Sequence, residues 1–522
     1  MKLTMMILAV LTYLGFMVYL GAKLSKQNKT SDDLYLGGRK LGPFVTAMSA
    51  EASDMSSWLL MGLPGLALIN GLAGFGGQAG FAESVWTAIG LAVGTYINWL
   101  IVAKRIRIYS AKTKSSTIPS FLSDRFGDKK GILTAIAAIV IIVFFVPYTA
   151  SGFSAIGKLA SALFGVEYHT VMIVGAIILV AYTVLGGFLA ASITDLIQSI
   201  VMTIALFVVV FYGIENAGGM ESVKAAILGI DGIDSLGQYF SLTGTDGSFG
   251  FLPIVSTLAW GLGYFGMPHI LLRFMAIEDE GKLTLSRRVA SVWVTVSMAV
   301  AIFIGVLGFA FVTNNGIIDT EGFDKENVIV YFADAIGSLD SFGAIIAGVI
   351  IAGILASIMS TADSQLLAAS SSVSENLVKK FFWRDMNDKT QMWFARGTMV
   401  VIAIVAIFLA WDPTSSVFKI VSFAWAGFGA AFGPVILFAL FWKRTNKWGA
   451  FAGILTGGSV VFIWKYLIRP LGGAWNIYEL LPAFILASVA IVVTSLLTAA
   501  PEKDVLDTFD EVSAACKSKA AD

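Results

Sequence analysis

Thirteen apolar segments follow one another along this chain of 522 residues, separated only by short polar connections. A helix needs about 20 predominantly apolar residues to cross a bilayer, so each segment predicts a membrane-spanning helix. The predicted spans lie near residues 3–22, 42–69, 75–102, 131–162, 168–186, 190–213, 249–274, 290–313, 340–372, 394–411, 414–441, 448–467 and 476–499. No connection is long enough for a soluble domain. We therefore expect an all-α polytopic membrane protein with a single integral membrane domain.

The composition indicates a surface that faces lipid. The chain is 57% hydrophobic and 13% charged, whereas soluble domains carry about 25% charged residues. Lys plus Arg and Asp plus Glu both number 35, so the basic excess of a nucleic-acid-binding protein is absent. We expect the partners to be the lipid bilayer and a small solute, with no nucleic acid. The sequence leaves the oligomeric state open.

Catalytic motifs are weak in this sequence. Two histidines and one cysteine offer little for a metal triad or an activated nucleophile. The segment Gly261-Leu-Gly-Tyr-Phe-Gly266 matches a dinucleotide-binding fingerprint, but it lies inside an apolar helix and not between a strand and a helix. Neither a repeated filter loop nor rings of charge, as expected for a channel, occur in the sequence. We therefore expect neither an enzyme nor a channel.

Basic residues are distributed unevenly between the two sides of the membrane. With the N-terminus outside, the thirteen predicted spans place 28 of the 35 Lys and Arg residues in cytoplasmic segments and 7 outside. Connections that remain in the cytoplasm keep such an excess. The sequence therefore predicts a multi-pass protein of the cell membrane whose N-terminus is outside and whose C-terminus is cytoplasmic.

Two of the predicted spans are interrupted near their middle. The span 42–69 contains Ala47-Met-Ser-Ala-Glu-Ala-Ser-Asp-Met-Ser-Ser-Trp58, with two carboxylates and four serines. The span 249–274 contains Trp260-Gly-Leu-Gly-Tyr-Phe-Gly-Met-Pro-His269, with three glycines and a proline. The two spans begin five spans apart. Broken helices at matching positions of two halves indicate the binding site of a transporter built from inverted repeats.

Three carboxylates within the predicted spans are candidate functional residues. Asp54 and Glu51 fall at the expected midplane, where an ionised group costs at least about 2.5–3.5 kcal/mol unless it faces a partner or an aqueous cavity. In an intact helix they project about 60° apart and can share a cavity. They either handle an ion or brace the helix break through serines. Asp195, at the start of span 190–213, is either functional or an ordinary residue of a helix end.

Four hydroxyl side chains form a stripe on span 340–372. Ser357, Ser360, Thr361 and Ser364 share one face because their spacing follows the helical repeat. Hard cations prefer oxygen ligands, and an unwound segment such as 52–56 offers free backbone carbonyls. Together the two elements can supply a five-oxygen cage for Na⁺. Small hydroxyl residues also let membrane helices pack closely, and the spacing alone does not decide between these interpretations.

Three aromatic residues are set apart by their neighbours. Trp260 and Tyr264 lie one turn apart beside the glycine-rich break, and Tyr148 follows Pro147 in the middle of span 131–162. Aromatic walls beside free backbone donors suit a small amphiphilic solute. Aromatic residues in membrane helices also serve as packing or interface anchors, so these three remain candidates for a substrate pocket.

Several motifs occur in order between about residues 36 and 380. They are Leu36-Gly-Gly-Arg39, Ala52-Ser-Asp-Met55, Leu60-Met-Gly-Leu-Pro64, Gly186-Gly-Phe-Leu-Ala190 with Asp195, Gly263-Tyr-Phe-Gly266, Pro268-His-Ile270, and Met359-Ser-Thr361 with Ser364-Gln-Leu-Leu367. In this order they resemble the solute:sodium symporter family, and the similarity extends over nearly the whole chain. Several long motifs in order are far more specific than any one of them.

The resemblance implies a fold of thirteen helices with an outside N-terminus, ten of which form a five-plus-five inverted repeat with broken helices. The first helix, 3–22, is then an addition to an inverted-repeat core at about 42–441. Further helices follow at about 448–499, and residues 500–522 form a cytoplasmic tail.

The resemblance also implies site residues. The Na⁺ ligands would be the backbone carbonyls of Ala52, Met55 and Ser357 and the hydroxyls of Ser360 and Thr361. Asp54 would support Na⁺ binding and Asp195 would lie near the inward sodium path, while Glu51 is an added carboxylate and a further candidate for ion coupling. The substrate pocket would be lined by Tyr148, Trp260, Tyr264 and Pro268, with Ser56 at the helix break.

The function implied by the resemblance is Na⁺-coupled secondary-active symport. The expected substrate is L-proline or a closely related small zwitterionic amino acid, imported by alternating access, with Na⁺ as coupling ion. Two departures from the family pattern touch the pocket, because Met267 stands where glutamine is common and Ser57 where glycine is common. A proton-coupled or Na⁺-coupled carrier of another small organic solute is the alternative.

Overall fold

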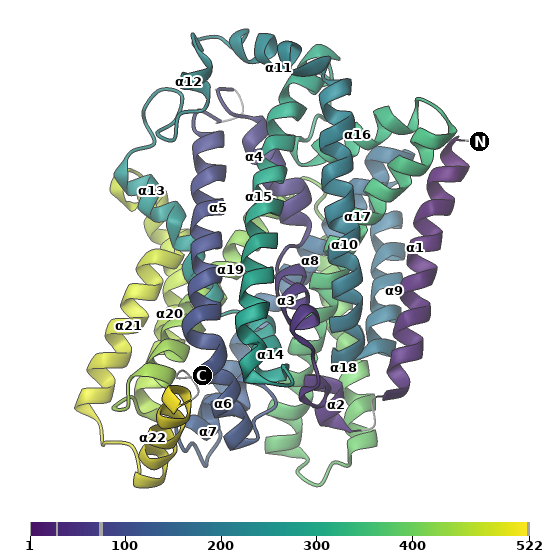
Figure 1. Ribbon diagram of the computed structural model, residues 1–522. Helices are drawn as coiled ribbons and strands as arrows, with labels where there is room; N and C mark the ends of the chain where they lie inside the picture. Colours follow the sequence, from purple (N-terminus) through teal and green to yellow (C-terminus); the bar gives the residue numbers. More distant parts are fainter. Residues whose placement is uncertain (1, 28–29, 73–76, 519–522) are drawn as a thin grey trace.

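Eleven helices in the computed structural model are long and apolar enough to span a membrane. The structure describes residues 2–27, 30–72 and 77–518. Within these ranges the regular elements are helical, apart from one isolated parallel bridge between Leu41 and Ile277. Figure 1 shows the long helices gathered into one bundle, with α1 at one side and α20 and α21 at the other. The prediction of an all-helical membrane protein is confirmed.

The long helices correspond to the uninterrupted predicted spans. They are α1 (Lys2–Leu24), α5 (Gly80–Ile97), α8 (Ile132–Phe164), α9 (Tyr168–Gly186), α10 (Phe188–Asn216), α15 (Leu283–Asn314), α17 (Ser341–Ser371), α18 (Asp388–Leu409), α19 (Val417–Phe441), α20 (Lys447–Ile463) and α21 (Leu480–Leu497). Two of them extend further than predicted. The helix of α5 continues through a π-helical turn (Asn98–Val102) into α6 (Ala103–Thr113), and α17 continues as the π-helical segment Ser372–Phe382.

The polar connections are more helical than the sequence analysis anticipates. They contain α2 (Ser31–Leu36), α7 (Ile118–Arg125), α11 (Gly219–Leu228), α12 (Leu236–Tyr239) and α16 (Val328–Gly337), and the tail forms α22 (Lys503–Ser518). The tail helix is held against α7, since Phe509 is buried and the Arg125 guanidinium lies 4.9 Å from its ring centroid. Tertiary packing therefore orders segments that hydropathy alone classes as loops.

The first interrupted span consists of two helices joined by an unwound segment. Helix α3 (Pro43–Ala52) ends where the chain turns through residues 53–57, and a π-helical turn (Trp58–Gly62) leads into α4 (Leu63–Leu68). The unwound backbone is stabilised by short-range bonds, with the Met55 amide donating to the Glu51 carbonyl at 2.8 Å and Ser56 to Asp54 at 2.7 Å. The predicted break is therefore present.

The second interrupted span is also broken. Helix α13 (Phe251–Leu258) passes into a 3₁₀ segment (Ala259–Phe265), and α14 begins at Pro268 and ends at Ala276. Met267 is extended, with φ −76° and ψ 109°, as expected for a residue that precedes proline. Because proline has no N–H to donate, it starts a new helix here and does not continue the old one.

Glycines allow the broken segment to approach its neighbours. A Cβ atom at Gly94 of α5 would lie 2.3 Å from the Gly261 carbonyl oxygen, and one at Gly263 would lie 1.9 Å from Nε1 of Trp425 on α19. Both distances are far below van der Waals contact, so a side chain at either position would push the helices apart. Small residues that permit close helix contact are typical of membrane bundles.

Candidate functional site

The end of α3 faces the hydroxyl stripe of α17. Ser360 donates its hydroxyl to the Ala52 carbonyl oxygen at 2.8 Å, and the Thr361 hydroxyl lies 3.4 Å from the same oxygen. The Ser360 hydroxyl is also 3.2 Å from the Ser357 carbonyl oxygen. All four residues are buried. Two backbone carbonyls and two hydroxyls, all neutral oxygen donors, are thus brought together at the first helix break.

The Ser357 hydroxyl and the Met55 carbonyl, which are also predicted near this cluster, do not bond to it directly within the described ranges. The Ser357 hydroxyl donates to the Ile354 carbonyl at 2.7 Å, so it bonds to its own helix and not to the cluster. Met55 is buried in the same unwound segment. Among the hydrogen bonds between described residues, none joins the Met55 carbonyl to the hydroxyls of α17. The residues that could hold a cation are therefore oxygen donors of the unwound segment and α17.

Among the described residues, His, Cys, Asp and Glu side chains do not form a second candidate metal site apart from this oxygen cluster. In the described parts of the chain, no group of three or more His, Cys, Asp or Glu side chains is placed to hold a metal ion. A cation bound at the first helix break would therefore rely mainly on neutral oxygens, which suits a hard monovalent ion better than a transition metal.

Asp54 connects the two broken helices. Its Oδ2 accepts a hydrogen bond from the Tyr264 hydroxyl at 2.6 Å, and its backbone carbonyl accepts one from Trp58 Nε1 at 3.0 Å. The Tyr148 hydroxyl lies 3.4 Å from the same carbonyl. Asp54 is fully buried, and within the described structure its Oδ1 atom has no hydrogen-bond partner. Asp54 therefore meets two predicted pocket residues, Tyr264 through its carboxylate and Tyr148 through its backbone carbonyl, and its Oδ1 keeps a free acceptor.

Glu51 faces a different neighbour from Asp54. Its Oε1 accepts a 2.7 Å hydrogen bond from Trp99 Nε1, and the Trp99 ring packs on Phe274 with centroids 4.4 Å apart. Its Oε2 has no partner among the described residues. The angle predicted for an intact helix does not apply, because the helix unwinds after Ala52. Glu51 belongs to α3 and Asp54 to the unwound turn.

The aromatic candidates gather on the second broken segment. Trp260 stacks on Tyr478 at a centroid distance of 5.1 Å and lies 6.3 Å from Trp58 of the first broken segment. Trp425 donates its Nε1 to the Trp260 carbonyl at 2.8 Å and meets the Tyr264 ring edge-on at 5.1 Å. An apolar wall therefore forms around the 3₁₀ turn, and a side chain satisfies one of the carbonyls that the turn frees.

The remaining candidates flank this wall. Pro268 is the first residue of α14, and Ser56 lies in the unwound turn with its hydroxyl 3.4 Å from the Trp58 amide. Both are buried, as are Tyr148, Trp260 and Tyr264. All five residues are therefore in the interior of the bundle and closed to solvent.

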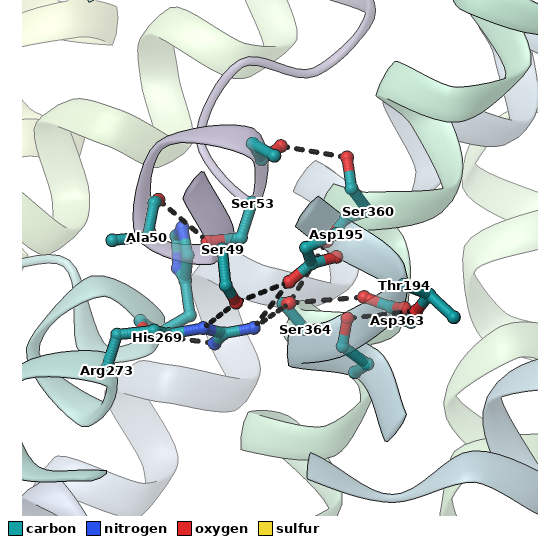
Figure 2. A network of polar contacts seen from close by, with 12 residues as sticks. Ser49, Ala50, Ser53, Thr194, Asp195, His269, Arg273, Ser360, Asp363 and Ser364 are labelled. Atoms are coloured by element: carbon teal, nitrogen blue, oxygen red, sulfur yellow. Dashed lines mark hydrogen bonds and ion pairs between the residues drawn. The ribbon is translucent and has the colours of Figure 1, made fainter. Parts of the chain in front are cut away.

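Asp195 takes part in a buried ion pair, shown in Figure 2. Its Oδ2 accepts hydrogen bonds from the Ser49 hydroxyl at 2.6 Å and from Nη2 of Arg273 at 3.2 Å. The side chains of Asp195 and Arg273 are 0% and 1% exposed. Asp195 is thus not an ordinary residue of a solvated helix end, because it pairs with a charge on the second broken helix.

Arg273 links this ion pair to the stripe on α17. Its Nη2 donates to the Ser364 hydroxyl at 2.5 Å, and Ser364 donates in turn to the Ser360 carbonyl at 3.0 Å. The Ser364 hydroxyl also lies 3.1 Å from Oδ1 of Asp363. A continuous chain of polar contacts therefore runs from Arg273 through Ser364, both labelled in Figure 2, to the oxygen cluster around Ala52.

Sequence reasoning missed Arg273 and Asp363. The count of basic residues takes Arg273 as part of a polar connection, whereas the structure buries it within the last turn of α14. Asp363 is a carboxylate inside span 340–372, next to the hydroxyl stripe. Ionisable residues inside membrane segments are candidate functional residues by default, so their position in apolar runs was the available signal.

Comparison with known proteins agrees with these features. A family model described as "Sodium:solute symporter family" matches residues 34–457. The chain belongs to the sodium:solute symporter family. The resemblance inferred from the motifs is thereby confirmed.

Curated relatives in this family match over nearly their whole length. The "Sodium/proline symporter" of Haemophilus influenzae is 41% identical over 514 residues, which cover 97% of each chain. The "High-affinity proline transporter PutP" of Bacillus subtilis is 40% identical over 95% of this chain and 98% of the relative. The "Sodium/proline symporter" of Escherichia coli is 39% identical over 98% and 97%.

Solved structures share the fold at low sequence identity. The "substrate-bound outward-open state of a Na+-coupled sialic acid symporter" superposes with a TM-score of 0.74 at 17% identity, over 96% of this chain and 99% of that one. MhsT in complex with L-phenylalanine superposes with a TM-score of 0.54 at 13% identity, over 88% and 98%. The helical bundle of this symporter-family chain is therefore a known transporter fold.

Proposed function

We propose that this chain is a Na⁺-coupled secondary-active symporter that imports L-proline, or a closely related small zwitterionic amino acid, by alternating access. The observation that carries the proposal is the meeting of the Ala52 carbonyl with the hydroxyls of Ser360 and Thr361 at a helix break. The names of the relatives at about 40% identity supply the solute. Na⁺ is then the coupling ion and not a prosthetic group.

In this proposal Na⁺ binds between the first broken segment and α17. Its ligands are the carbonyls of Ala52, Met55 and Ser357 and the hydroxyls of Ser360 and Thr361. The Ser360 and Thr361 hydroxyls that now point at the Ala52 carbonyl would turn their lone pairs to the ion. Freed carbonyls of broken helices coordinate coupling ions in transporters of this kind.

Three carboxylates would support the ion. Asp54 would add negative charge beside the cluster while holding Tyr264, and its free Oδ1 supports such a role. Asp195 would keep a negative charge near the inward path of Na⁺, where Arg273 balances it. Glu51, bonded to Trp99, would be a further ion-coupling group, and its second oxygen leaves room for a proton or ion.

The substrate would lie between the two helix breaks. Tyr148, Trp260, Tyr264 and Pro268 would line the apolar part of its pocket, and Ser56 would offer a polar contact in the unwound turn. Aromatic side chains suit the ring of proline. Met267 is fully buried beside Pro268. Methionine in place of the glutamine that is common in the family therefore removes a side-chain amide from the interior next to the proposed pocket.

Thirteen spans and an inverted repeat remain part of the proposal. The eleven long helices, with the two broken segments that contain the shorter apolar helices Trp58–Leu68 and Phe251–Phe265, sum to the predicted number. We propose an outside N-terminus, an added helix at 3–22, a core at 42–441, further helices at 448–499 and a cytoplasmic tail. Arg273 and Lys158 form buried ion pairs. The excess of Lys and Arg on the proposed cytoplasmic side remains when these two residues are left out of the count.

The driving force suffices for strong accumulation. One Na⁺ that crosses about 100 mV releases about 2.3 kcal/mol, and a tenfold Na⁺ gradient adds about 1.4 kcal/mol. At one-to-one coupling, the total supports a gradient of roughly five-hundredfold in the solute. Because all five pocket residues are buried, solute can enter and leave only when the helices move, as alternating access requires.

Competition for uptake tests the solute. In proteoliposomes with an inward Na⁺ gradient, labelled proline is offered together with unlabelled proline, alanine, pantothenate or a sugar. We expect proline to compete most strongly and the sugar not at all. If labelled proline is not accumulated and one of the other solutes, offered in labelled form, is accumulated, the alternative carrier is correct and the pocket assignment from the family is wrong.

A further inference from the structure

An apolar groove of about 430 Å³ lies between α5 and α15. The two helices run side by side, as Figure 1 shows. Every residue that lines the groove is apolar except Thr295, and the floor includes the small residues Ala88, Ala92 and Ala299. Such a groove on a membrane protein is suited to a hydrocarbon chain.

The groove has the length of one acyl chain. Its lining covers residues 81–92 on α5 and 295–306 on α15. At 1.5 Å per residue each stretch is about 16 Å long. This equals about half of the 30 Å hydrocarbon thickness, and the lining begins about 12 Å along α15 from Arg287.

A polar ladder leads from one end of the groove. Arg287, Ser291 and Thr295 are spaced by four residues, so they share one face of α15. The Arg287 guanidinium lies 5.3 Å from the ring centroid of Tyr96, which is one turn beyond Ala92 of the groove. The arginine is thereby held at the groove's end by the neighbouring helix.

Two atoms of this ladder are left without partners. Arg287 Nε and Ser291 Oγ are buried and form no hydrogen bond with any described residue. None of the ion pairs between described residues includes Arg287, whereas the carboxylate of nearby Glu278 pairs with Lys282 at 2.6 Å. A buried polar atom without a partner is unfavourable, and a phosphate provides the acceptor oxygens that arginine binds best.

We propose that the α5–α15 groove binds one anionic phospholipid. The acyl chain fills the groove, and the phosphate accepts hydrogen bonds from Arg287 and Ser291, with the exposed Arg288 adding positive charge. The basic bias assigns this end of α15 to the cytoplasmic side, so the phosphate lies at the inner leaflet and the acyl chain runs along α15 past the middle of the membrane, toward Phe240 at the far end of the groove. Basic sites between helices on that side are suited to anionic headgroups.

Native mass spectrometry of the purified full-length protein tests the proposal. The detergent-solubilised protein is titrated with phosphatidylglycerol or phosphatidylcholine of matched acyl chains. We expect the wild type to bind phosphatidylglycerol at least tenfold more tightly. Arg287→Gln should bring the two lipids to equal affinity, and Ala299→Phe should weaken both by filling the groove. Arg287→Lys should keep part of the preference for phosphatidylglycerol, because lysine retains the positive charge but cannot form the two parallel hydrogen bonds that a guanidinium makes with phosphate.

Arg396→Gln is the matched control. The Arg396 guanidinium also lies over an aromatic ring, 5.2 Å from the centroid of Trp393, and its Nε is likewise without a partner in the described structure. It belongs to α18 and lies outside the groove lining. Equal binding of the two lipids by the wild type, or an unchanged preference in Arg287→Gln, would overturn the proposal. Displacement of the lipid by millimolar inorganic phosphate would instead indicate a simple anion site.

Discussion

The Tyr264 hydroxyl donates a 2.6 Å hydrogen bond to the Asp54 carboxylate and so joins the two broken helices at their breaks. One residue belongs to the proposed substrate wall and the other to the turn that follows the proposed Na⁺ ligand Ala52. A movement of either broken helix can therefore reach the other through this bond. This contact gives a physical route by which ion and substrate can affect each other's binding.

Tyr264→Phe should therefore weaken both ligands. The substitution leaves a buried carboxylate oxygen without its donor, at a cost of about 1–3 kcal/mol. Because coupling between two bound ligands is reciprocal, we expect the half-saturating concentrations of Na⁺ and proline to rise together. Uptake kinetics at varied Na⁺ and proline measure both. Tyr466→Phe, at an exposed tyrosine, is the control, and a change confined to proline would refute the bridging role.

Thr361→Val should raise the Na⁺ requirement. Valine has nearly the same shape but removes one oxygen of the proposed cage. A hydrogen-bond-like contact to a charged group is worth about 1.5–3 kcal/mol, so the half-saturating Na⁺ concentration should rise at least about tenfold. Thr398→Val is the control, because Thr398 is half-buried on α18, away from the proposed cage, and among the described residues its hydroxyl bonds to the Phe394 carbonyl at 2.9 Å. Unchanged Na⁺ dependence in Thr361→Val would refute the cage.

The Asp195–Arg273 pair should be strongly coupled. Removing one partner of a buried ion pair leaves an uncompensated charge and costs about 3–5 kcal/mol. We expect Asp195→Asn and Arg273→Gln each to lower thermal stability sharply, and the double variant to recover part of the loss. The exposed Lys282–Glu278 pair, 2.6 Å apart, is the control and should show less than about 1 kcal/mol of coupling. Additive effects at Asp195 and Arg273 would contradict the expected coupling.

A second buried pair closes one end of the bundle. Lys158 of α8 lies 2.9 Å from Glu326, which also accepts hydrogen bonds from the Ser416 hydroxyl at 2.8 Å and the Val417 amide at 3.1 Å at the start of α19. The preceding residue is close to the first broken segment, since a Cβ at Gly65 would lie 2.8 Å from the Lys325 carbonyl. Glu326 therefore ties α8, α19 and the region of α4 together.

Glu326→Gln should loosen this end. In a chain with Cys516→Ser, which removes the single cysteine, we introduce Ala67→Cys on the buried side of α4 and measure its reaction with a membrane-impermeant maleimide. We expect Glu326→Gln to increase the reaction rate several-fold. Glu221→Gln, at an exposed carboxylate on α11, should leave the rate unchanged. Equal rates in both variants would show that Glu326 does not hold the end closed.

Local chemistry made the helix breaks and the hydroxyl stripe predictable. Pro268 cannot continue a hydrogen-bond ladder, and the spacing of Ser357, Ser360 and Thr361 is a property of any helix. Hydropathy likewise predicted the long spans, because each must cover the same hydrocarbon thickness.

Partners brought together by the tertiary fold were not predictable in this way. Arg273 and Asp195 are 78 residues apart, and Trp425 reaches the Trp260 carbonyl across 165 residues. No local pattern indicates which distant side chain satisfies a buried charge or a freed carbonyl. The same reason explains α16 and α22, which are ordered by packing against other helices.

The most direct measurement is uptake of labelled proline by purified protein in proteoliposomes, with Na⁺, Li⁺ and proton gradients imposed separately. We predict that an inward Na⁺ gradient drives accumulation above the outside concentration, that a negative-inside potential increases it, and that a proton gradient alone does not drive it. Accumulation that is indifferent to Na⁺ would contradict the proposed Na⁺ coupling.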